Sequence, residues 1–165
     1  MSSIYTGTPP SFLAGEIASA TKLLEITNLM TALTDAWTTW TPTLTNLTLG
    51  SGTLVSVYRR LGKTIEYRFQ FTYGAGSAVG TGPQFTLPVA PHSSYGAFAA
   101  LIGMGLIRDA SAGTIRDARV FVSAGSTMQI NAMDNTGGSA SITATAPWTW
   151  AAPDVLSVEG RYYIA

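Results

Sequence analysis

The spacing of apolar residues changes at Trp40, and this change divides the chain into two parts. Before Trp40, apolar residues are separated alternately by three and four positions: Leu23, Ile26, Met30, Leu33 and Trp37. This is the a/d pattern of a coiled-coil seam, and it predicts a helix over residues 19–39. A helix of this length is marginal in water unless it packs against something, so the pattern implies a partner chain.

After Trp40 the apolar residues recur at every second position, which is typical of half-buried antiparallel strands. Turns rich in Gly, Asp and Asn separate these segments at a spacing of roughly ten residues. Strands are expected near 41–49, 53–60, 63–73, 84–88, 96–108, 115–123, 127–133, 140–146 and 155–164. The predicted fold is mainly β: a jelly-roll-like antiparallel β-sandwich head over residues 40–165, preceded by one short N-terminal coiled-coil helix.

Residues 1–18 contain prolines and glycines but little apolar periodicity, so we expect an extended arm there. Ser19 or Thr21 is expected to cap the helix that follows. The run 97–107 is too short for a membrane helix, which needs about 20 apolar residues. Gly103 and Gly105 within this run predict a buried strand with a close backbone approach.

The chain has few charges, and they cancel. Nine basic and nine acidic residues give no net charge, so neither nucleic acid nor an anionic membrane is expected as a partner. The charged fraction of 11% is less than half of the roughly 25% usual in soluble domains, which favours a subunit flanked by other subunits. Without cysteine, disulfides and thiolate chemistry are excluded, and no secretion signal is recognised at the N-terminus.

Residues for catalysis or metal binding are sparse. His92 is the only histidine and lies in an expected loop, and no Gly-x-Ser-x-Gly motif is present. Asp109 with Asp117, or Asp134 with Asp154, would be needed as a pair for glycoside hydrolysis, but their spacing favours turns and surface positions. A calcium ion at Asp134 is the more elaborate alternative to a turn there. We therefore expect no enzyme activity, no metal and no cofactor.

Trp148 and Trp150 are the candidate glycan contacts. On an extended segment, side chains at i and i+2 project to the same side, so the two indoles could stack on a sugar ring. The alternative is that both rings pack into the sandwich or at a subunit interface.

Several stretches resemble a known family. These are WTPTLT at 40–45, LGSGTL at 49–54, YRRLGKTI at 58–65, GPQFTLP at 82–88 and FLAGEI at 12–17. They resemble segments of minor tail proteins and fibre-like virion proteins of bacteriophages, particularly those infecting actinobacteria. The resemblance covers roughly the first 90 residues and is moderately specific.

The resemblance implies a homotrimeric virion protein that docks on the particle through its N-terminal part and points its head outward. The virion anchor would lie in the arm and include Tyr5, Pro9, Pro10, Phe12 and Glu16. The implied partners are other copies of the chain, other phage virion proteins in the tail or capsid, and a host cell-surface glycan. The implied location is the virion surface, after assembly in the host cytoplasm. The alternatives are a capsid decoration protein or head fibre, a free carbohydrate-binding module and, least favoured, a depolymerase.

Overall fold

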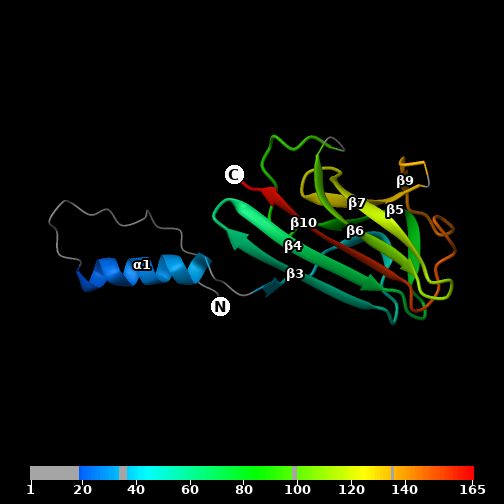
Figure 1. Cartoon of the computed structure of the whole chain (residues 1–165), viewed down its shortest axis with the longest axis horizontal. Coiled ribbons are helices and arrows are strands. Elements are labelled where there is room, and N and C mark those ends of the chain that lie inside the picture. The colour runs from blue at the N-terminus through cyan, green and yellow to red at the C-terminus, as the bar shows by residue number, and fades with distance from the viewer. Residues whose placement is uncertain (1–18, 34–36, 98–99, 135) are drawn as a thin grey trace.

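The computed structural model describes residues 19–33, 37–97, 100–134 and 136–165, so the expected arm lies outside the described residues. This part contains one helix and ten strands (Figure 1). In chain order they are α1 (Ala20–Leu33), β1 (Thr38–Thr39), β2 (Leu44–Thr48), β3 (Thr53–Leu61), β4 (Thr64–Thr72), β5 (Ala78–Thr86), β6 (Leu101–Asp109), β7 (Thr114–Val122), β8 (Thr127–Met133), β9 (Ser139–Ser141) and β10 (Val155–Tyr163).

The strands form one antiparallel sheet in the order β1-β3-β4-β10-β6-β7-β8-β5-β2, with β9 paired to β8. Hairpins join β3 to β4, β6 to β7, β7 to β8 and β8 to β9, whereas β10 lies between β4 and β6, and β5 lies between β8 and β2. Figure 1 shows the sheet curled so that one half covers the other, with α1 beyond one end. This confirms the predicted mainly β, sandwich-like fold with a single short N-terminal helix.

Trp40 holds the two ends of the curled sheet together. The chain crosses here from β1, which pairs with β3, to β2, which pairs with β5. The backbone N–H of Trp40 donates to the carbonyl of Ser56 in β3 (3.1 Å), and its indole Nε1 donates to the carbonyl of Thr86 in β5 (3.2 Å). One residue therefore bonds to strands at opposite ends of the sheet order.

The core lies between the two halves of the sheet. The inward positions of β4, from Ile65 to Phe71, are almost completely buried, as the alternation predicts. Phe69 of β4 stacks on Phe85 of β5, with ring centroids 3.8 Å apart and planes inclined by 13°. Each fully buried side chain of this size contributes about 1.5–3 kcal/mol to the stability of the head.

The glycines of β6 meet β10 closely, which confirms the expected backbone approach. A Cβ atom on Gly105 would overlap the carbonyl oxygen of Ser157 in the paired strand. The other face of β6 is exposed rather than buried, because Met104 and Leu106 point away from the core.

Several elements differ from their sequence-based predictions. Strand β9 ends at Ser141 rather than at 146, and β6 begins at Leu101 rather than at 96. The described helix ends at Leu33, and Thr38–Thr39 pair with β3 instead of continuing it; β-branched residues favour such pairing. Strand β5 begins at Ala78 rather than at the expected 84. The prediction placed the start too late because Gly80 and Gly82 indicate a loop by sequence alone. In the fold, their missing side chains leave room for Asn46 of β2 and Gln129 of β8.

Ser19 caps α1, as predicted. Its Oγ accepts the backbone N–H of Lys22 (3.2 Å), and its carbonyl accepts that of Leu23 (3.0 Å). An N-cap of this kind satisfies one of the free N–H groups of the first turn.

Candidate functional site

The apolar residues on α1 form the first candidate site. Leu23 and Met30 are 53% and 62% exposed, and Ile26 is half-buried. At spacings of three and four they share one face of the helix. Leu33 is the last residue of α1, and its side chain is not among those described. An apolar face with this exposure is what a coiled-coil seam presents before its partners pack. The seam itself stays a prediction.

Trp37 does not extend this face, because it lies outside the described helix and directly before β1. Its ring lies against two guanidinium groups, with Cζ of Arg59 at 5.1 Å and Cζ of Arg68 at 5.8 Å from the ring centroid. Arg59 pairs with Glu66 (2.6 Å), and Arg68 pairs with Glu159 (3.0 Å). The ring of Trp37 therefore lies on the outer face of the head.

The segment between β9 and β10, residues 142–154, carries both candidate glycan contacts. Trp150 is only 6% exposed. Its Nε1 donates to the carbonyl of Thr143 (3.0 Å), and its ring stacks on that of Tyr73 (centroids 6.4 Å apart, 21°). Trp150 therefore packs into the sandwich, which is the alternative predicted from the sequence, and its ring is too buried to stack on a sugar.

Trp148 differs from its neighbour. The two rings lie together, with centroids 6.2 Å apart, as the i, i+2 spacing predicts. Trp148 is half-buried, and its Nε1 is covered but has no hydrogen-bond acceptor within the described part of the chain. A buried indole N–H usually finds an acceptor, which distinguishes Trp148 from its neighbour. Because Trp148 is also less buried than Trp150, it remains the candidate contact of the pair.

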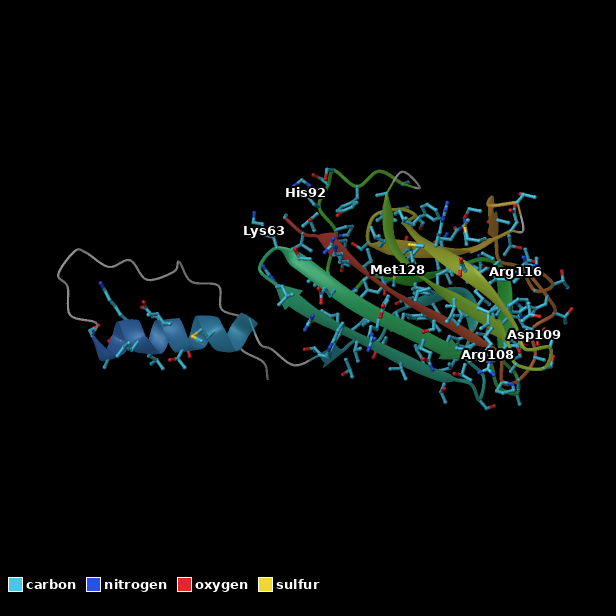
Figure 2. The ribbon with its side chains drawn as sticks, viewed as in Figure 1. Lys63, His92, Arg108, Asp109, Arg116 and Met128 are labelled. Atoms are coloured by element: carbon cyan, nitrogen blue, oxygen red, sulfur yellow. The ribbon has the colours of Figure 1, made fainter. Side chains whose placement is uncertain are left out.

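Arg116 is a further candidate that the sequence reasoning missed. It is the inward-facing partner of Ile107 in the β6–β7 register, and its Nε is covered and has no acceptor among the described residues. Figure 2 places it with Arg108 and Asp109 at the end of the head away from α1. Its position in the sequence could have indicated this. Arg116 lies two residues before Ala118, so both side chains share the inward face of β7.

Asp109 organises the turn between β6 and β7. Its Oδ1 accepts the backbone N–H groups of Ser111 and Ala112 (both 2.9 Å), and these bonds hold the pKa of the carboxyl below its usual range. Asp117 is on the opposite face of the hairpin, because it pairs with the outward-facing Leu106. These two carboxylates therefore do not form a catalytic pair.

Asp134 organises the turn between β8 and β9 in the same way. Its Oδ1 accepts the hydroxyl and N–H of Thr136 (2.7 and 2.8 Å) and the N–H of Gly138 (2.7 Å), which lowers the pKa of Asp134. The buried Asp154 accepts the N–H groups of Ala110 and Ala151 (both 2.9 Å). Both carboxylates therefore fix loops. Within the described ranges, no three or more His, Cys, Asp or Glu residues are grouped to hold a metal ion.

His92 lies in an exposed turn near the α1 end of the head (Figure 2). Its Nδ1 lies 2.9 Å from the hydroxyl of Ser94 and accepts the backbone N–H of the same residue (3.1 Å). The contact spans two positions along the chain and stabilises the turn.

Comparison of the chain with protein-family models, curated proteins and solved structures finds no match. Among the residues described, no helix has the length and apolar character needed to cross a membrane.

Proposed function

We propose that this chain is a non-enzymatic bacteriophage virion protein: a homotrimeric surface spike that is anchored by its N-terminus and presents its β head for attachment to the host surface. The observation that carries the proposal is the exposed apolar face of α1 next to a head with its own core. The resemblance to minor tail and fibre-like virion proteins supports the same assignment.

The energetics of α1 favour self-association. The helix has 14 residues, which is marginal for an isolated helix in water. Burying its apolar face in a three-stranded coil would contribute about 1.5–3 kcal/mol for each side chain fully covered. Three copies would also compensate for weak binding by each head, since linked sites raise avidity without new contacts.

The end of the head away from α1 is suited to contact a host surface. The turns after β6 and β8 lie there together with the segment 142–154. Asp109, Asp134 and Asp154 fix these loops through hydrogen bonds to backbone N–H groups. Loops held in one conformation lose less entropy when they bind, which favours attachment through this end.

The test is competition for adsorption. The purified full-length chain, added to host cells before the phage, should reduce phage adsorption, and its native mass should be three times 17.3 kDa. Bovine serum albumin at the same concentration serves as the inert control. A monomer that leaves adsorption unchanged at saturating concentration would contradict the proposal.

A free carbohydrate-binding module is the second candidate function, and Trp148 is the observation that favours it. Part of its ring is exposed and would stack on a sugar ring. Such a module would show a saturable change of indole fluorescence with saccharide as a monomer, and Trp148→Ala should abolish that change.

A further inference from the structure

The outer face of the five strands β3, β4, β10, β6 and β7 holds most of the charges of the head. The register places on it five arginines and three acidic residues: Arg59, Arg68, Arg108, Arg119, Arg161, Glu66, Asp117 and Glu159. Two ion pairs on β3, β4 and β10 neutralise four of these charges within the chain.

The β6–β7 part of this face is different, because it combines exposed apolar side chains with charges that form no ion pair with any described residue. The apolar residues, which are 38–57% exposed, are Leu101, Met104, Leu106 and Ile115. We call these four residues, with Arg108, Asp117 and Arg119 between them, the β6–β7 patch.

The register alternates apolar and charged residues across the patch. Met104 lies opposite Arg119, Leu106 opposite Asp117, and Ile115 opposite Arg108. None of the three charged side chains has an ion-pair partner within the described part of the chain. Interfaces between proteins are enriched in Met and Arg, and exposed apolar side chains gathered in one place mark such surfaces.

We propose that the β6–β7 patch is the contact between heads of neighbouring copies, in which Asp117 of one copy pairs with Arg119 of the next. This inference rests on the homotrimer of the proposed function and names the head surface that completes it. A second copy is the occupant because the patch carries unpaired charges of both signs. Around a threefold axis, the acid of each copy can meet the arginine of the next in a closed ring.

A charge swap in the full-length chain tests the pairing. Asp117→Arg leaves two adjacent positive residues in each copy, and Arg119→Asp leaves two negative ones. Each single variant should weaken trimer association by about tenfold or more in sedimentation equilibrium, since close interfacial charge pairs contribute at least about 1.5 kcal/mol. The double swap should restore association. An equimolar mixture of the two single variants should restore it only in part, because a ring of three copies always keeps one contact between like charges.

Cross-linking provides a second readout that does not depend on affinity. The natural chain has no cysteine, so introduced thiols are the only ones present. Asp117→Cys combined with Arg119→Cys should give covalent trimers on mild oxidation, because a disulfide needs Cα atoms within about 7 Å. Ser139→Cys combined with Ser141→Cys is the matched control: both positions are exposed and spaced i, i+2 on β9.

The possible results separate this inference from the function on which it rests. Weakened single variants, a restored double swap and cross-linking only at β7 would support it. A trimeric wild-type chain with unaffected single variants and no cross-linking at β7 would overturn the head contact and leave the spike intact. A monomeric wild-type chain at all concentrations would overturn both the contact and the trimer. Thermal unfolding of each variant verifies that it is folded.

Discussion

Trp148 and Trp150 are two positions apart and share a loop, but their surroundings differ. Trp150 donates its indole N–H to Thr143 and stacks on Tyr73, whereas the covered N–H of Trp148 has no acceptor among the described residues. An unsatisfied buried donor costs roughly 1–3 kcal/mol, so the two indoles should respond differently to loss of the N–H.

Replacing each tryptophan with phenylalanine tests this difference. Trp150→Phe should lower the free energy of unfolding by about 1–3 kcal/mol, because it removes packing volume and leaves the Thr143 carbonyl without its donor. Trp148→Phe should be close to neutral, because the donor that it removes makes no hydrogen bond to any described residue. Urea unfolding of both variants measures the difference, and equal destabilisation would contradict the reasoning.

Gly105 is required by the close approach of β6 and β10. A Cβ atom there would overlap the Ser157 carbonyl and crowd Val158. Gly105→Ala should destabilise the head by about 1–3 kcal/mol, the usual cost of forcing atoms into a packed interior. The matched control is Ser141→Ala on exposed β9, which should change stability by less than about 0.5 kcal/mol. A stable Gly105→Ala protein in thermal unfolding would show that the two strands can separate.

Asp134 should make the stability of the head sensitive to acid. Its pKa is lowered in the folded protein by hydrogen bonds from Thr136 and Gly138. A lowered folded pKa means that the stabilisation is present above the ordinary value for aspartate, about 3.9, and is lost as the pH falls through the folded value. Asp134→Asn should therefore lose less stability below about pH 4 than the wild type. Thermal unfolding of both proteins against pH measures this, and an equal loss of stability in acid would contradict the reasoning.

At the level of elements, residue periodicity predicted the strands that face the core on one side only. β3, β4, β7, β8 and β10 lie within a few residues of their expected limits. The prediction failed at β5, where tertiary packing requires glycine inside a strand, and at the end of α1, where pairing with β3 takes over. Strand order depends on contacts between residues distant in sequence, which local patterns do not contain.

The coiled-coil interpretation of α1 can be tested with two adjacent leucines. Leu23 belongs to the a/d series, whereas Leu24 is displaced by one position and is 60% exposed. Leu23→Ser should weaken trimer association at least tenfold, because each copy loses a buried side chain. Leu24→Ser has the same effect on helix propensity but should leave association unchanged. Sedimentation equilibrium compares them, and equal effects would exclude the predicted seam.

At the level of the whole molecule, the head contains the core, and α1 carries an exposed apolar face. The core cluster extends from Leu47 to Ile164 and includes none of the α1 residues whose side chains the structure describes. Trp37 lies against Arg59 and Arg68 on the outer face of the head, so a chain starting at Trp37 keeps these contacts. The head should therefore stay folded when α1 is removed. In the proposed trimer, the avidity of three linked heads should then be lost.

A chain of residues 37–165 tests this division. Its melting temperature should stay close to that of the full chain, because the core is intact, but its native mass should move towards the monomer. Losing the linkage between heads should reduce its potency in the adsorption competition by about a hundredfold or more, since avidity typically contributes 10²–10⁴. Leu24→Ser in the full chain is the control that keeps the trimer. A shortened chain that stays trimeric and competes as strongly would mean that the heads alone, through the β6–β7 patch, hold the spike together.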